Sequence, residues 1–328
     1  MNKNTVLLVA MFLFKGVSAA AMGNAAGYVL LEDIGARGAG LAGACTSFSG
    51  DITLLRYNPA SIYDIRDAQL SSIYYNSGMT GMNFGSITYG QNIGIGVLGL
   101  NLAYLDGGVM ELNSSDGSTL NVASEQDLMG SVSLGIPMGN KLGLGASIKL
   151  LSSTLLGSKN ALTIAADAGA VYKGFILEEL NAGASILNMG TGLKYLDTIE
   201  PLPFYVQAGF SYPVNGLAVD LLLVAAVDGV YNINDKIFGV KAGIEGNYKE
   251  FYGRIGIPFG LTDDQSFSLG LGYRMSNQYS FDYAVSFGKS LGLTHRISIG
   301  MAFGEIEASR SNIKKLEKNR NIIKRTIQ

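Results

Sequence analysis

The sequence predicts an all-β protein, a transmembrane antiparallel up-and-down β-barrel of about 14 strands. The main observation is a repeated unit between residues 68 and 303, in which stretches of roughly ten residues alternate apolar with small or polar side chains before a polar turn. In the last unit, Leu293, His295, Ile297, Ile299, Met301 and Phe303 fall on one face, and Thr294, Arg296, Ser298, Gly300 and Ala302 fall on the other. A side-chain period of two predicts a strand. A long series of strands predicts a barrel, because closure pairs the edges that would otherwise stay exposed.

The composition agrees with a wall that contacts lipid. Hydrophobic residues make up 48% of the 328 residues and charged residues 15%, yet no charge-free apolar run approaches the ~20 residues of a membrane-spanning helix. The apolar residues are therefore spread over strands, each of which gives every second residue to the lipid face. Because the chain has no Trp, its 17 Tyr and 14 Phe are expected to form the aromatic girdle at the membrane surface.

Fourteen strands are expected, joined alternately by tight turns and longer loops. They cover residues 68–76, 84–91, 93–105, 126–137, 141–154, 161–172, 179–188, 203–213, 216–228, 236–248, 250–258, 265–275, 278–288 and 292–303. An even number returns the chain to its starting side, as in single-chain bacterial barrels. Tight turns such as residues 138–140 are expected on the periplasmic side, and long connections such as residues 106–125 on the outside.

Both ends of the chain lie outside this repeat. Residues 1–19 are predicted to be a cleaved secretory signal peptide, because Asn2 and Lys3 precede an apolar core at 5–14 and a small-residue cleavage site at 17–19. The protein is therefore expected in the outer membrane of a bacterial cell. Residues 304–328 form a basic tail with apolar side chains near one helical face, which predicts a marginal amphipathic helix on the periplasmic side. The alternative is a solvated tail.

Residues 20–67 do not alternate, and they are rich in Gly and Ala with charges spaced through them. Irregular backbone is tolerated at membrane depth where it lies inside protein, so this segment is predicted to fold into the lumen as a plug. The alternative is a periplasmic lead-in packed below the barrel. Glycines within the predicted strands, such as Gly94, Gly96, Gly143, Gly145, Gly270 and Gly272, are expected to face the plug, although glycine is also common at bends.

Charged side chains also occur in the middle of predicted strands, opposite an apolar face. They are Lys149, Asp167, Asp220, Lys241, Glu245, Arg254, Arg274 and Asp282. A charge that faced lipid at mid-depth would cost roughly 2–4 kcal/mol, so these residues are expected to line the lumen. There they could pair with Arg37 and Asp51 of the plug and hold it.

The sequence gives no sign of an enzyme, a cofactor, a metal site or nucleic-acid binding. His295 is the sole histidine and Cys45 the sole cysteine, which leaves no credible catalytic base, transition-metal cluster or intramolecular disulfide. Residues 38–43 match the glycine pattern of a dinucleotide-binding loop, but no β-α-β alternation follows. The formal net charge is −2 and no basic cluster precedes the tail, so nucleic acid is not expected as a partner.

Several stretches, taken in order along the chain, resemble the PorV/PorQ family of outer-membrane barrels, which are distant relatives of the FadL transporters. The first are Gly35-Ala36-Arg37-Gly38-Ala39-Gly40-Leu41-Ala42-Gly43-Ala44, then Asp51 and Tyr57-Asn58-Pro59-Ala60. Later ones are Leu102-Ala103-Tyr104-Leu105-Asp106-Gly107-Gly108, Asn188-Met189-Gly190, Asp282-Tyr283-Ala284 and Leu291-Gly292-Leu293-Thr294-His295-Arg296. The resemblance implies a fourteen-strand barrel with its N-terminal segment in the lumen. It marks Gly35, Arg37, Gly40, Gly43, Asp51, Asn58, Pro59 and Ala60 as the plug motif. The basic tail beyond Phe303 departs from the family pattern.

Two functions are expected from this resemblance. The first is a non-enzymatic component of protein secretion or surface assembly, of the type IX kind, whose partners are secretion proteins or exported cargo as well as lipid. The alternative is a FadL-like channel for the uptake of hydrophobic small molecules. A scaffold predicts a plugged lumen and partner-binding outer loops such as residues 106–125, whereas a transporter predicts an apolar tunnel and a lateral gap beside a kinked strand.

Overall fold

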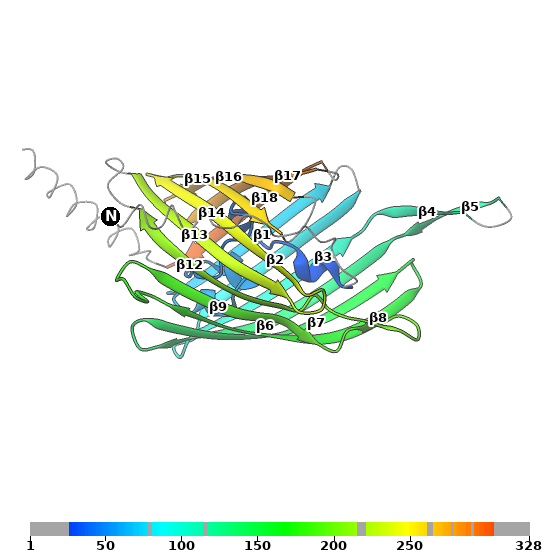
Figure 1. The fold of residues 1–328 in the computed structure, drawn as a ribbon, viewed down its shortest axis with the longest axis horizontal. Coiled ribbons are helices and arrows are strands. Elements are labelled where there is room, and N and C mark those ends of the chain that lie inside the picture. Colours follow the sequence, from blue (N-terminus) through cyan, green and yellow to red (C-terminus); the bar gives the residue numbers. More distant parts are fainter. Residues whose placement is uncertain are drawn as a thin grey trace, which may run out of the picture.

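A closed barrel of antiparallel strands is the main element of the structure, a computed structural model that describes residues 26–77, 81–113, 117–214, 221–260, 265–276, 278–289 and 292–304 (Figure 1). The barrel strands are β1 (Ala68–Ser77), β2 (Met82–Asn92), β3 (Val97–Asp106), β6 (Glu125–Met138), β7 (Leu142–Leu155), β8 (Lys159–Tyr172), β9 (Asn181–Gly190), β12 (Tyr205–Val214), β13 (Leu221–Asn232), β14 (Ile237–Tyr248), β15 (Phe251–Phe259), β16 (Gln265–Met275), β17 (Tyr279–Gly288) and β18 (Leu293–Phe303). Each strand pairs with its neighbour along the chain, and β1 pairs with β18 to close the wall. The predicted fourteen-strand barrel is thus confirmed.

The predicted strand ranges differ from the observed ones by a few residues, most clearly at two places. The strand expected at 93–105 begins only at Val97, because residues 93–96 form the turn after β2 and Gly94 adopts a positive φ of 91°. The placement of Gly94 and Gly96 within a strand was therefore wrong. The strand expected at 216–228 is β13, which continues to Asn232, so that Asp228 lies within the strand and not at its end.

Two further strand pairs lie in the longest connections, and both are at the same end of the barrel. β4 (Val109–Asn113) and β5 (Thr119–Ala123) form a ribbon between β3 and β6, and Figure 1 shows it extending beyond the wall. β10 (Leu193–Lys194) and β11 (Ile199–Glu200) form a short pair between β9 and β12. We call this end the hairpin end and the opposite end, where turns such as residues 139–141 and 249–250 lie, the turn end.

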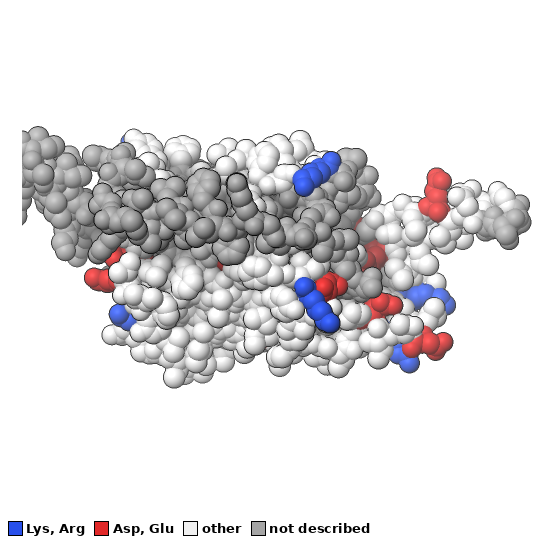
Figure 2. Space-filling model, viewed as in Figure 1, with Lys and Arg blue, Asp and Glu red and all other residues white. Residues whose placement is uncertain are grey.

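The outer face of the wall is apolar around the barrel, as the alternation predicts. Large apolar side chains exposed on this face include Leu100, Leu102, Ile148, Leu162, Ile164, Ile244, Leu271, Ile297 and Ile299. On the face shown in Figure 2, charged side chains lie at the left end and over the right half, and the described surface between these two groups is white. Such a band matches the hydrocarbon layer of a membrane. Among the described residues, no helix has the length and apolar character needed to span a membrane.

The lumen holds residues 26–67, which we call the lumen segment. It contains the short helices η1 (Tyr28–Leu31), α2 (Ala36–Gly40), η2 (Ile52–Arg56) and η3 (Pro59–Ile62). The Ala26 N–H donates to the Pro201 carbonyl at the hairpin end, and Asp64 pairs with Lys173 at the turn end. The described chain therefore enters at the hairpin end and runs the length of the lumen before β1 begins (Figure 1).

Glycines on the inner face of the wall let this segment approach the strands closely. A Cβ at Gly145 would overlap the backbone of Pro59 and Ala60, and one at Gly143 would overlap the ring of Tyr63. Gly270 lies against Gly40 of α2 in the same way, while Gly272 makes room for Arg254 and Asp282 of the wall. A side chain at Gly143, Gly145 or Gly270 would displace the lumen segment, and one at Gly272 would disturb the ion pair between Arg254 and Asp282.

Three sequence-based predictions fall outside the described residues: the signal peptide at 1–19, the helical tail at 304–328 beyond its first residue, and the lumen position of Asp220.

Candidate functional site

The glycine run that follows Gly35 forms α2 and the turn after it. Gly35 precedes the helix, and a Cβ there would overlap Thr53 of η2. A Cβ at Gly40 would lie 2.9 Å from the Cα of Gly270, and Gly43 has a positive φ of 75°. These three glycines therefore allow α2 to pack against both η2 and the wall.

Arg37, the charged residue of this run, joins the lumen segment to the wall. Its guanidinium pairs with Asp51 at 3.0 Å and with Glu245 of β14 at 2.7 Å. Arg254 of β15 then bridges Glu245 and Asp282 of β17, with both contacts at 2.7 Å. Arg274 of β16 completes this ion-pair chain by pairing with Asp282 at 2.9 Å. The structure thus brings together six of the residues singled out from the sequence.

Burial makes the inner part of this ion-pair chain sensitive to the loss of a member. The Arg254 side chain is 0% exposed and those of Glu245 and Asp282 are 7% exposed, whereas Arg274 at the end of the chain is 21% exposed. Charges taken out of water depend on their partners, so the removal of one leaves an uncompensated buried charge.

Asp51 adds local order to the same region. Its carboxylate accepts hydrogen bonds from the backbone N–H and the hydroxyl of Thr53, at 2.9 and 2.7 Å, and so caps η2. Burial alone would raise the pKa of Asp51, but the Arg37 guanidinium and the Thr53 donors outweigh it and hold this pKa below the usual value for an aspartate. Asp51 is therefore charged at neutral pH.

Asn58, Pro59 and Ala60 fasten the segment to the opposite side of the barrel. The Asn58 side chain accepts the Ala60 N–H at 3.0 Å and caps η3, whose first residue is Pro59. Its amide donates to the carbonyls of Thr46 at 2.7 Å and of Ala170 in β8 at 3.0 Å. Pro59 needs no hydrogen-bond partner for its nitrogen at this first helical position.

The predicted lumen charges outside the ion-pair chain occupy two further places. Lys149 of β7 and Asp167 of β8 pair at 2.7 Å, and Lys149 also donates to the Asn188 side chain at 2.7 Å. Lys241 of β14 forms no ion pair within the described residues, and its ammonium lies 5.8 Å from the centre of the Tyr57 ring.

Sequence reasoning missed Asp228, which binds the lumen segment directly. One of its oxygens accepts the N–H groups of Cys45 and Thr46, at 2.8 and 2.9 Å, and the Thr46 hydroxyl at 2.7 Å. The sequence-based strand ends at Asp228, so this residue is absent from the predicted mid-strand charges, whereas β13 continues to Asn232. Arg296 was also missed, although its position on the polar face of the last repeat was a usable signal; it lies 3.8 Å from Asp33.

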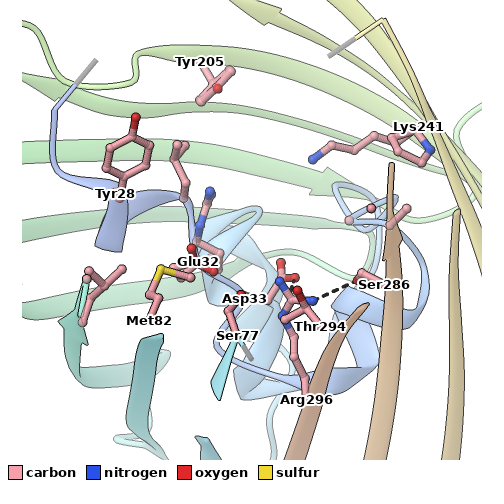
Figure 3. A pocket seen from close by; sticks show the side chains of 18 of the residues that line it. Tyr28, Glu32, Asp33, Ser77, Met82, Tyr205, Lys241, Ser286, Thr294 and Arg296 are labelled. Carbon is pink, nitrogen blue, oxygen red and sulfur yellow. Dashed lines mark hydrogen bonds and ion pairs between the residues drawn. The ribbon is translucent and has the colours of Figure 1, made fainter. Parts of the chain in front are cut away.

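A cavity of ≈ 520 Å³ opens between the lumen segment and the hairpin end (Figure 3). Tyr28, Glu32 and Asp33 of the lumen segment contribute to its lining, while Lys241 and Arg296 extend into it from the wall. The remaining lining includes apolar side chains of η1 and the wall, such as Leu31, Leu105, Leu187 and Val230. The cavity therefore offers both apolar surface and charged groups to a small molecule.

Beside this cavity, the regular pairing of the wall strands is interrupted at β9. β9 pairs with β12 only from Asn181 to Leu187, and its register against β8 shifts between Ala166 and Ala168. Asn188, at the irregularity, has a positive φ of 62°, and its side chain donates to the Pro203 carbonyl at 2.9 Å. The last residues of β9 therefore leave β12, as at a β-bulge.

A second cavity of ≈ 240 Å³ lies where β9 and β12 separate. Asn188, Met189, Gly190, Thr191, Gly192, Ile199, Pro201, Leu202, Phe204 and Asn234 line it. Leu187 lines the larger cavity and Asn188 the smaller one, so adjacent residues separate the two. The connection between β9 and β12 folds over this place with Leu193 and Leu202 buried.

The residues considered for chemistry are dispersed. Cys45 is buried in the lumen segment, and burial raises the pKa of its thiol well above the usual value. His295 lies on the outer face of β18, where the Tyr283 hydroxyl and the His295 Nδ1 are hydrogen-bonded at 2.6 Å. Within the described ranges, no cluster of three or more His, Cys, Asp or Glu side chains is arranged to hold a metal ion.

Comparison with known proteins gives structural neighbours only. No protein-family model matches the chain, and no curated protein is similar to it in sequence. The TodX deltaS2S3 mutant monoaromatic hydrocarbon channel superposes with a TM-score of 0.58 at 14% identity, over 83% of this chain and 100% of its own. A Pseudomonas aeruginosa FadL homologue superposes with a TM-score of 0.50 at 13% identity, over 82% of this chain and 98% of its own. No family match supports the PorV/PorQ resemblance, which stays a prediction. The structural neighbours are FadL-family outer-membrane β-barrels, and the likeness is one of fold.

Proposed function

We propose that this protein is an outer-membrane channel that admits hydrophobic small molecules at the hairpin end and releases them sideways into the membrane. The main observation in support of this proposal is the separation of β9 from β12 beside the larger cavity. A molecule in that cavity would have to pass Leu187 and Asn188 to reach the second cavity and the lipid-facing surface near Met189, which is exposed. The fold shared with the TodX channel supports the same proposal.

The lumen segment favours a sideways exit over passage along the barrel axis. Between the larger cavity and the turn end, it is packed against wall glycines and held by the Arg37 ion pairs and by Asp228. Axial passage would require these contacts to break together. Sideways passage requires movement of the connection between β9 and β12, which lines the cavity at the place where these two strands separate.

A reversible disulfide should test the sideways route. Thr163 of β8 and Thr191, the first residue after β9, have hydroxyl oxygens 3.1 Å apart, so cysteines at both positions are placed to form a disulfide. In a Cys45→Ala background, we expect oxidised Thr163→Cys/Thr191→Cys protein to lose most of its transfer of naphthalene into outer-membrane vesicles, measured by fluorescence. Reduction should restore transfer in the same sample. Equal transfer by the oxidised and reduced forms would contradict the proposed route.

The β4–β5 ribbon favours a second candidate function, a scaffold for protein secretion or surface assembly. Met110 pairs with Val122 and Leu112 with Leu120, so four apolar side chains share one face of the ribbon, and Leu120 is 60% exposed. An exposed apolar face with two unpaired strand edges is suited to bind another polypeptide.

Replacement of residues 109–123 by a short Gly-Ser linker tests this second candidate. If the protein is a scaffold, the tagged intact chain should recover secretion components or exported cargo from native outer membranes, and the ribbonless variant should lose most of that recovery. Heat-modifiable mobility in gels should show that both barrels are folded. Recovery of a hydrophobic small molecule alone, by both forms, would sink the scaffold function.

A further inference from the structure

At the turn end, the connection between β8 and β9 (residues 173–180) exposes an apolar tip. Phe175, Ile176 and Leu177 are 50%, 77% and 40% exposed although they lie beyond the ends of both strands. The turn has a defined shape, because the Phe175 N–H donates to the Leu180 carbonyl at 2.8 Å and the Leu180 N–H to the Leu177 carbonyl at 3.0 Å. Exposure of three consecutive large apolar side chains to water is unfavourable in free energy. We therefore expect another apolar surface to cover this tip.

The apolar tip is continuous with the outer face of the wall. The Phe175 ring lies 6.2 Å from that of Tyr172 in an edge-to-face arrangement and 6.1 Å from that of Phe210. Both partners are exposed on the outer face, at the turn-end limits of the apolar band. Aromatic side chains at this level are typical of the boundary between hydrocarbon and headgroups.

Charged side chains divide the turn into two sides. Lys173 points into the barrel, where it pairs with Asp64 and lies 5.2 Å from the centre of the Tyr63 ring. Glu178 and Glu179 follow the tip and are exposed, as expected of groups that remain among the hydrated headgroups. The turn is thus amphipathic, with its apolar side continuous with the lipid face and its basic residue fixed to the lumen segment.

We propose that the apolar tip of the β8–β9 turn is anchored in the interfacial layer of the lipid bilayer at the turn end. This anchor holds Lys173 in position against Asp64, so lipid contact outside the barrel steadies the end of the lumen segment inside it. The proposal requires that the barrel spans a membrane, and it is independent of whether the barrel acts as a channel or as a scaffold.

Because the chain has no Trp, one introduced tryptophan reports on a single position. We expect Ile176→Trp, in nanodiscs of brominated phosphatidylcholine, to lose emission nearly as much as Ile148→Trp on the lipid face, and to resist quenching by acrylamide. Asn140→Trp, in an exposed turn at the same end, should behave in the opposite way. Leu177→Trp repeats the test should Ile176→Trp fail to fold.

Two results would overturn the proposal. One is acrylamide quenching of Ile176→Trp equal to that of Asn140→Trp, without an effect of brominated lipid. The other is a tryptophan at 176 that is open to acrylamide in nanodiscs but shielded in native outer membranes, which would assign the apolar tip to a protein partner.

Discussion

Gly145→Ile should force the end of the lumen segment out of place while leaving the barrel wall intact. A β-branched residue suits a strand, but its side chain would overlap the backbone of Pro59 and Ala60, and overpacking of this kind costs about 1–3 kcal/mol. We expect trypsin to cut the folded variant at Arg37 and Arg56, which lie inside the lumen, while the parent protein resists at both sites.

Gly130→Ile is the matched control for this experiment. Gly130 lies on the lipid-facing side of β6, and a Cβ there would have no heavy atom within 4 Å. The same substitution should therefore leave Arg37 and Arg56 protected. If Gly145→Ile resists trypsin as well as Gly130→Ile does, close packing against Gly145 does not retain the segment.

Arg254→Met should give the largest loss of stability among the ion-pair variants. It would leave Glu245 and Asp282 buried with one partner fewer each, and breaking a buried ionic contact in this way costs about 3–5 kcal/mol. Unfolding in urea, followed by tyrosine fluorescence and gel mobility, would measure the difference in the free energy of unfolding.

Arg274→Met serves as the comparison, because Arg274 is partly exposed and its pair with Asp282 lies at the end of the ion-pair chain. It should cost about 1 kcal/mol or less. The double variant Arg254→Met/Asp282→Asn should be more stable than the sum of its single changes predicts, since it removes a carboxylate together with its partner. Equal losses for Arg254→Met and Arg274→Met would show that burial does not set the strength of these contacts.

The period of two was sufficient to predict the barrel because every strand keeps one apolar face toward lipid. It also placed charges such as Glu245 and Arg254 on the inner face. It could not predict which charges meet, since that depends on the stagger between strands and on how deep α2 lies in the lumen. The ion-pair chain therefore emerges only from the three-dimensional fold.

Other features were missed for different reasons. The sequence of the β4–β5 ribbon has short alternating stretches on either side of a Ser-Asp-Gly sequence, which is a hairpin signal that could have been used. The separation of β9 from β12 has no comparable signal in the sequence. It arises at Asn188, where β9 stops pairing with β12 and its register against β8 shifts. Local sequence does not encode that contact.

The pairing of β1 with β18 has a consequence for the order of assembly. These are the first and last strands of the barrel, so the seam between them can close only after the other strands have been made. The lumen segment precedes β1, and its Ala36 N–H donates to the Ser298 hydroxyl of β18 at 3.1 Å. A lumen segment already in place would thus offer a docking surface to the inner face of β18 when this strand arrives. Closure of the barrel wall and enclosure of the lumen segment would then occur in the same step.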